Sequence, residues 1–187
     1  MMKFKLTLLI LLVYTSLSAQ FGLWTAPGFY EDQRRNGTGL SISFGFRERL
    51  FKYAGIGMEF GIIDNQDIDP QDVFNYGYYH NPYDFDWVGK KYVGPQWGFD
   101  FLIFANPSPY ISLYTGGGLY FQRYGEMYFN QWYGSYYPQG GNLTYQVEKA
   151  YSGGMHINLP VNRFIQVILG GGYHSVRGGQ LILGFSV

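Results

Sequence analysis

The chain has 187 residues, with 13 Lys and Arg balanced by 13 Asp and Glu, so its formal net charge is zero. Only 14% of the residues are charged, whereas an average soluble domain has ~25%. This balanced charge, without a long basic run, argues against nucleic acid as the main partner. The sequence contains no cysteine, which excludes disulfides, cysteine metal ligands and thiol nucleophiles.

Residues 1–19 have the pattern of a secretory signal peptide. Two lysines precede the apolar run 6–13, and small residues follow it as far as Ala19. This run is too short to span a bilayer. A charged start, a short apolar stretch and a small-residue end are the three parts of a cleaved signal. We therefore expect the mature chain to begin near Gln20 and a barrel domain to occupy residues 20–187.

Beyond residue 20, apolar residues alternate with small or polar ones, and this period of two is typical of a β-strand. In the segment 38–48, for example, Leu40, Ile42 and Phe44 alternate with serine and glycine residues. No window of this region shows a convincing helical period. We predict strands over seven segments: 38–48, 51–63, 91–104, 110–122, 142–157, 163–173 and 180–187.

The connections between these strands alternate in length. The tight ones run from Arg47 to Leu50, from Ala105 to Pro109 and from Leu159 to Arg163, and the long ones cover 64–90 and 123–141. Outer-membrane barrels have short periplasmic turns and longer external loops. If the tight turns are periplasmic, one more strand must precede residue 38, and residues 20–29 are the candidate. The total is then eight strands, with both ends of the barrel in the periplasm.

The two faces of the strands distinguish a membrane barrel from a soluble one. A soluble lipocalin-like barrel buries its apolar face around a ligand, so its outer face needs charged residues. Here the polar faces are mainly Gly, Ser and Gln, with Glu59, Asp100 and Glu148 and no Lys or Arg in register with them. We predict an all-β fold, an eight-stranded antiparallel up-and-down transmembrane β-barrel. A secreted soluble ligand-binding barrel is the alternative.

The signal segment, the strand count, the alternation of turn lengths and the closing strand Gln180–Val187 resemble the small eight-stranded outer-membrane β-barrel family, of the OmpX and OmpA-barrel type. The resemblance covers residues 20–187. It implies a bacterial outer-membrane location with both termini periplasmic, contact with membrane lipid and lipopolysaccharide, and a structural or surface-interaction role. The Ser18-Ala19-Gln20 junction and the loops rich in Tyr and Asn look like Bacteroidetes-type proteins.

Four polar residues are predicted to meet inside the barrel: Glu59, Asp100, Glu148 and His174. A carboxylate beside an imidazole can orient a general base, so a lipid A-modifying enzyme is the competing functional class. His174 and Ser175 superficially resemble the His and Ser of such enzymes, but adjacent strand residues point to opposite faces. A barrel of this size has an interior filled by side chains. We favour a hydrogen-bonded plug with no catalytic residue.

The two long connections are rich in aromatic residues. Tyr and Trp supply rigid contact area at a low entropic cost, so we predict a contact surface for a glycan or a protein. The alternative is that the two connections pack on each other as a cap over the barrel. The residues assigned to this loop contact surface are Tyr78, Tyr79, Trp87, Trp132 and Tyr133.

The charged residues near the long connections suggest two further ligands. Six aspartates lie within 64–90, and clustered carboxylates can hold Ca²⁺, which takes ~6–8 oxygen ligands. Their spacing lacks the glycine and terminal glutamate of an EF-hand, so we favour a solvated acidic loop and predict no metal and no cofactor. Lys90, Lys91, Arg123 and Lys149 are expected near the outer rim, where they either meet lipopolysaccharide phosphates or remain ordinary rim charges.

Overall fold

The computed structural model describes residues 20–32, 37–65, 85–130 and 139–187. In these ranges no helix is long and apolar enough to span a bilayer. The strands of the described residues are β1 (Phe21–Asp32), β2 (Gly37–Phe51), β3 (Ala54–Ile63), β4 (Phe85–Tyr92), β5 (Gln96–Ser108), β6 (Ile111–Asn130), β7 (Gln139–Pro160), β8 (Gln166–His174) and β9 (Gly178–Ser186).

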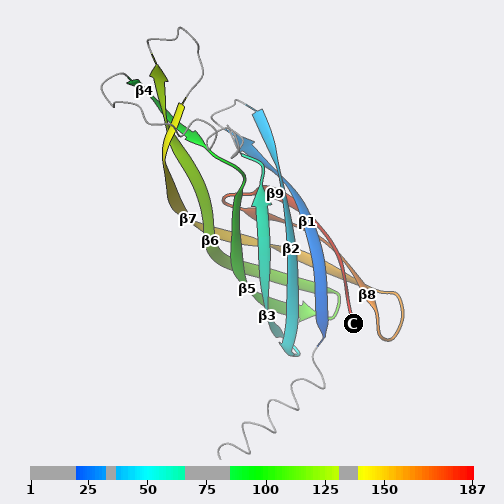
Figure 1. Ribbon diagram of the computed structural model, residues 1–187. Coiled ribbons are helices and arrows are strands. Elements are labelled where there is room, and N and C mark those ends of the chain that lie inside the picture. Colours follow the sequence, from blue (N-terminus) through cyan, green and yellow to red (C-terminus); the bar gives the residue numbers. More distant parts are fainter. Residues whose placement is uncertain (1–19, 33–36, 66–84, 131–138) are drawn as a thin grey trace, which may run out of the picture.

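Eight of these strands form a closed antiparallel barrel (Figure 1). Neighbours along the chain pair with each other, except that β3 pairs with β5 because β4 lies outside the ring. The ring closes between β1 and β9, where Leu23 pairs with Phe185 and Thr25 with Leu183. The predicted fold class, an eight-stranded antiparallel up-and-down barrel, is confirmed.

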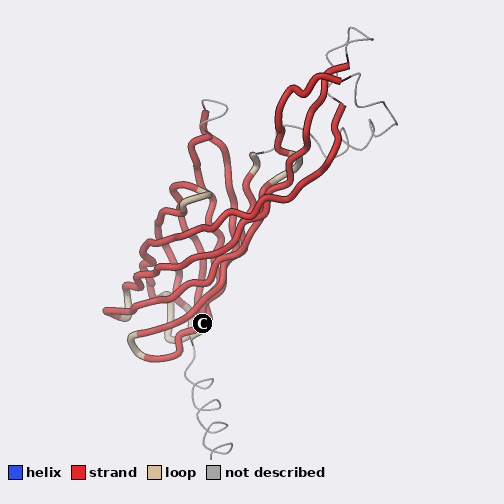
Figure 2. The backbone as a smooth tube through the Cα atoms, turned by 90° about the vertical axis from the view of Figure 1, so that its left-hand side faces the viewer, coloured by secondary structure: helices blue, strands red, loops and turns tan. Residues whose placement is uncertain are grey.

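The two ends of the barrel differ. One end, called the terminal end here, carries Gln20, Val187 and the turns at 52–53, 109–110 and 161–165. At the opposite loop end, β6 and β7 continue past the barrel, and β4 pairs with the extended part of β6. These three strands belong to the same sheet as the barrel and extend beyond it at this end (Figure 2), and we call the extension the projecting sheet.

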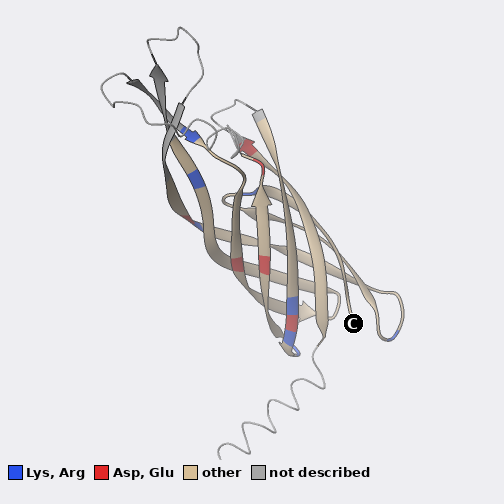
Figure 3. Ribbon diagram, viewed as in Figure 1, with Lys and Arg blue, Asp and Glu red and all other residues tan. Residues whose placement is uncertain are grey.

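Side chains alternate strictly between the two faces of the barrel wall. In β2, Leu40, Ile42 and Phe44 are 42–63% exposed, whereas Ser41 and Ser43 are buried in the lumen. The same alternation is clear along β1, β3, β5 and β9, and charged residues are sparse on the wall (Figure 3). The outer face is therefore the apolar belt of a transmembrane barrel, and the polar face is the lumen.

The predicted strand boundaries are wrong at the loop end. In the described part of the segments 64–90 and 123–141, residues 85–90 belong to β4, residues 123–130 to β6 and residues 139–141 to β7, although the sequence predicts loops there. These strands pair with one another beyond the ring of eight strands. The predicted strand 91–104 is interrupted at Gly94, whose φ is 72°. Pro95 follows it, and a proline has no N–H to donate to a ladder.

The tight turns lie a few residues later than predicted. Residues 47–50 belong to β2, and the turn is at Lys52 and Tyr53. β5 continues to Ser108, and β7 continues to Pro160. The first strand covers the predicted segment 20–29 almost entirely and continues to Asp32.

Trp24 needs a glycine on each of its neighbouring strands. It pairs with Gly45 of β2 and with Gly184 of β9, and its buried indole lies over Gly45. A Cβ added to Gly45 would overlap ring atoms of Trp24, and one added to Gly184 would lie 2.7 Å from the Trp24 Cβ. The bare backbone of these strands therefore makes room for the largest side chain of the lumen.

We predict that Gly45→Ala lowers the free energy of unfolding by about 1–3 kcal/mol, because the added methyl group overpacks the lumen. Gly179→Ala is the matched control, since a Cβ there meets nothing within 4 Å. Urea unfolding of the refolded chain in detergent micelles measures both variants. Equal stability of the two variants would contradict this packing.

Candidate functional site: the lumen plug and the mouth pocket

Five buried side chains meet in the half of the lumen nearer the loop end, and we call this cluster the plug: Glu59, Asp100, Tyr120, His174 and Arg177. Arg177 reaches in from the turn between β8 and β9. Its Nη1 donates to Glu59 Oε1 at 2.7 Å, and its Nη2 donates to Asp100 Oδ2 at 3.4 Å. All three charged side chains are at most 3% exposed, so Arg177 compensates carboxylates that water cannot reach.

The hydrogen bonds of His174 define its tautomer. The backbone N–H groups of Val176 and Arg177 both donate to Nδ1, at 3.1 and 3.0 Å. Nδ1 is therefore the unprotonated nitrogen, and Nε2 carries the hydrogen. Nε2 lies 3.1 Å from both carboxylate oxygens of Asp100 and donates to them. His174 is thus a neutral connector between the β8–β9 turn and the plug.

Neutral donors complete the coordination of the two carboxylates. The hydroxyl of Tyr120 donates to Asp100 Oδ2 at 2.9 Å, and Ser43 Oγ donates to Glu59 Oε1. Buried carboxylates are stable only when such donors satisfy their lone pairs. The plug therefore fixes five strands and one turn to one another across the lumen.

A second polar cluster lies nearer the terminal end and is centred on Arg47. Its Nη1 donates to Ser112 Oγ at 3.0 Å and lies 3.4 Å from His156 Nδ1. Its Nη2 donates to Asn158 Oδ1 at 2.5 Å. Among the residues that the structure describes, no carboxylate belongs to this cluster. The guanidinium of Arg47 therefore donates its hydrogen bonds to neutral acceptors.

An apolar layer accompanies this second cluster. The rings of Trp24, Phe104 and Tyr114 surround His156, with ring centroids 5.1–5.3 Å from that of His156. Leu102 and Ile168 pack in the same buried group. Side chains rather than water therefore fill the barrel interior, as expected for eight strands.

The lumen residues predicted from the sequence do not all meet. The structure brings Glu59, Asp100 and His174 into direct contact with Arg177 or with one another, but Glu148 lies apart from them. Its carboxylate accepts a hydrogen bond from Gln96 Nε2 at 3.2 Å, at the loop end of the lumen.

The contact-surface residues are placed only in part. Tyr78, Tyr79, Trp132 and Tyr133 lie outside the described residues. Trp87 belongs to β4, but the described part of the structure does not include its side chain.

Two functional residues were missed in the sequence. The expectation that no cation lies in register with the lumen carboxylates is wrong, because Arg177 pairs with both Glu59 and Asp100. It lies in a turn, where the period of a strand carries no information. Arg47 continues the inward series of Ser41, Ser43 and Gly45, so the alternation could have identified it as a lumen residue.

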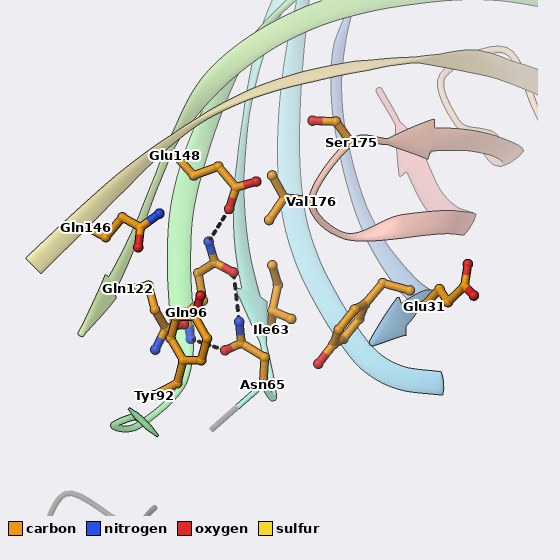
Figure 4. A pocket seen from close by; sticks show the side chains of 11 residues that line it. Glu31, Ile63, Asn65, Tyr92, Gln96, Gln122, Gln146, Glu148, Ser175 and Val176 are labelled. Atoms are coloured by element: carbon orange, nitrogen blue, oxygen red, sulfur yellow. Dashed lines mark hydrogen bonds between the residues drawn. The ribbon is translucent and has the colours of Figure 1, made fainter. Parts of the chain in front are cut away.

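Above the plug, the lumen opens into a mouth pocket of about 280 Å³ at the loop end. Residues from most barrel strands and from the β8–β9 turn surround it, as Figure 4 shows. Four of its side chains are amides and two are carboxylates. The lining consists of Tyr30, Glu31, Ile63, Asn65, Tyr92, Gln96, Gln122, Gln146, Glu148, Ser175 and Val176.

The plug has no geometry for nucleophilic catalysis. His174 is fully buried, and both of its ring nitrogens are engaged. Ser175 Oγ accepts a hydrogen bond from the backbone N–H of Tyr151, on the side of β7. Within the described ranges, no group of three or more His, Asp or Glu residues is arranged to hold a metal ion.

An antiparallel eight-stranded barrel with an apolar exterior and a filled polar lumen is a small transmembrane β-barrel. No protein-family model matches the chain, and no curated protein matches it. Among solved structures it is similar to Ail, the attachment invasion locus protein of Yersinia pestis, with 11% identity over 90% of this chain and 95% of that chain and a TM-score of 0.49.

The chain is also similar to Neisserial surface protein A, with 13% identity, a TM-score of 0.47, and coverage of 90% of this chain and 96% of that chain. Ail in complex with the heparin analogue sucrose octasulfate gives 11% identity, a TM-score of 0.48, and coverage of 90% and 96%. Likeness at this level assigns neither a ligand nor an activity to the present chain.

We predict that Arg177→Met destabilises the barrel by about 3–5 kcal/mol, because it leaves two buried carboxylates without their cation. Arg163→Met, at an exposed arginine of the β7–β8 turn, is the control and should change stability by less than about 0.5 kcal/mol. Adding Asp100→Asn to Arg177→Met should restore part of the loss. Denaturant unfolding in micelles measures all three variants, and equal effects of Arg177→Met and Arg163→Met would exclude the plug as a stabilising unit.

Proposed function

We propose that this protein is a non-enzymatic barrel of the bacterial outer membrane that presents a contact surface outside the cell. The observation that carries the proposal is the projecting sheet, in which β4, β6 and β7 continue beyond the barrel at the loop end. A barrel with a filled lumen gains no transport function from its interior, whereas an extension beyond the membrane can meet a partner.

Strand lengths support the position of the projecting sheet outside the bilayer. A transmembrane β-strand needs ~9–11 residues. β8 and β9 have 9 residues each, which is just enough to cross. β6 has 20 residues and β7 has 22, so about half of each exceeds the requirement for crossing a membrane.

The orientation follows from the turns and from the N-terminal sequence. Short turns are periplasmic in outer-membrane barrels, so the terminal end would face the periplasm and the loop end the exterior. The signal peptide predicted for residues 1–19 supports export of the chain. The Bacteroidetes-type origin suggested by the sequence near Gln20 stays a prediction.

The partner would be a glycan or a protein that meets the aromatic residues of the connections at the loop end. In the sequence, residues 131–138 connect β6 to β7, and residues 66–84 precede β4. These segments contain four of the predicted contact residues: Tyr78, Tyr79, Trp132 and Tyr133. Lys90, Lys91 and Arg123, on β4 and β6, would meet lipopolysaccharide phosphates at the rim.

The competing class, a lipid A-modifying enzyme, has less support. Such an enzyme needs a general base that lipid in the outer leaflet can reach. His174 has no exposed surface and is committed to Asp100 and to the β8–β9 turn. The geometry therefore favours a structural role for this histidine.

We predict that changing Tyr78, Tyr79, Trp132 and Tyr133 together to Ser abolishes partner binding by cells that carry the protein in their outer membrane, because the aromatic contact area is lost. The matched control changes the same four residues to Phe and keeps that area. Binding is measured on a printed array of glycans and purified extracellular proteins. The proposal is contradicted if the Ser variant binds as well as the unmodified chain, or if the unmodified chain binds no more than cells without it.

A further inference from the structure

The mouth pocket differs from the plug below it in the balance of charge. In the plug, Arg177 compensates two carboxylates, and its guanidinium is turned toward them and away from the pocket. Two carboxylates, Glu31 and Glu148, line the mouth pocket, and none of the described residues that line it is Lys, Arg or His. An anionic ligand would therefore be repelled, and a cation attracted.

Hydrogen bonds hold the polar lining of the pocket in one orientation. Asn65 Nδ2 donates to Gln96 Oε1 at 3.0 Å, and the backbone N–H of Gln96 donates to Asn65 Oδ1 at 3.2 Å. Gln96 Nε2 then donates to Glu148 Oε2 at 3.2 Å. Figure 4 shows this chain of contacts across the pocket wall. The amides of Asn65 and Gln96 are therefore fixed by their neighbours.

This arrangement leaves acceptors without donors. Glu148 Oε2 receives one hydrogen bond from an amide, and no cation of the described residues pairs with its carboxylate. Gln122 is 3% exposed, and its Nε2 donates to the backbone oxygens of Gly94 and Arg123. Its Oε1 has no hydrogen-bond partner. A buried acceptor without a partner is rare, so Gln122 Oε1 points to a ligand that brings donors, and the exposed carboxylate of Glu148 lines the same pocket.

We infer that the mouth pocket binds a small polar molecule with a protonated amine, of the amino sugar class. The amine would pair with Glu148, and hydroxyl groups would bond to the amide lining. Two tyrosines, Tyr30 and Tyr92, add aromatic surface of the kind that attracts cations. A volume of about 280 Å³ is near the lower limit of small-molecule sites, which is ~300 Å³. None of the residues that line this pocket belongs to the set assigned to the aromatic contact surface proposed above.

The test is a calorimetric titration of the refolded full chain in detergent micelles with three sugars of similar size. Glucosamine, at a pH where its amine is protonated, should bind saturably; glucose should bind more weakly, and glucuronate should not bind. Glu148→Gln should weaken glucosamine binding by about tenfold, because it removes a charge-assisted contact. Glu48→Gln, at a carboxylate near the terminal end, is the matched control and should leave binding unchanged.

Since Glu148 is exposed and takes no part in the plug, its variant should fold, and a gel comparison of boiled and unboiled samples verifies this. The inference is overturned if glucosamine shows no saturable binding, if all three sugars bind equally, or if Glu148→Gln binds glucosamine as tightly as the unmodified chain. None of these results bears on the contact surface, because its test replaces none of the residues named above as lining the pocket.

Discussion

Pairing of β1 with β9 closes the barrel, and every other feature depends on this closure. In a bilayer no water is available to satisfy free backbone groups, so a sheet can cross only if it has no open edge. Phe21 and Val187 each donate their backbone N–H to the carbonyl oxygen of the other, at 3.0 and 2.8 Å, at the start of this seam. Once the ring is closed, each strand has one face toward lipid and one toward a lumen of fixed width.

The narrow lumen then determines which side chains can lie inside. Among the described residues, the buried charged side chains apart from histidine are Arg47, Arg177, Glu59 and Asp100, two of each sign. The carboxylates lie toward the loop end with Arg177, and Arg47 lies toward the terminal end among neutral acceptors. Because these side chains fill the interior, the described barrel has no open pore on which its function could depend. This leaves the loop end, with its pocket and projecting sheet, as the part that can meet other molecules.

The alternation of apolar and polar residues predicts most of this barrel, because lipid outside and packing inside impose a period of two on every wall strand. The prediction fails where that constraint ends. β4 and the outer part of β6 pair with each other beyond the ring of eight strands, and Arg177 lies in a turn. Alternation also predicts whether a side chain faces the lumen or the lipid, but it does not predict its position along the barrel axis. For this reason Glu148 was predicted beside Glu59, although it lies at the mouth.

Quenching of tryptophan fluorescence by brominated phospholipids tests the central claim, that the apolar face meets lipid and the polar face lines a filled lumen. Trp97 is 44% exposed on the outer face, and Trp24 is 4% exposed in the lumen. Variants that keep one of these tryptophans, with the others changed to Phe, are refolded into bilayers. We expect strong quenching of Trp97 and little quenching of Trp24. Equal quenching of both, stronger quenching of Trp24, or a chain that stays in solution without quenching would contradict the account.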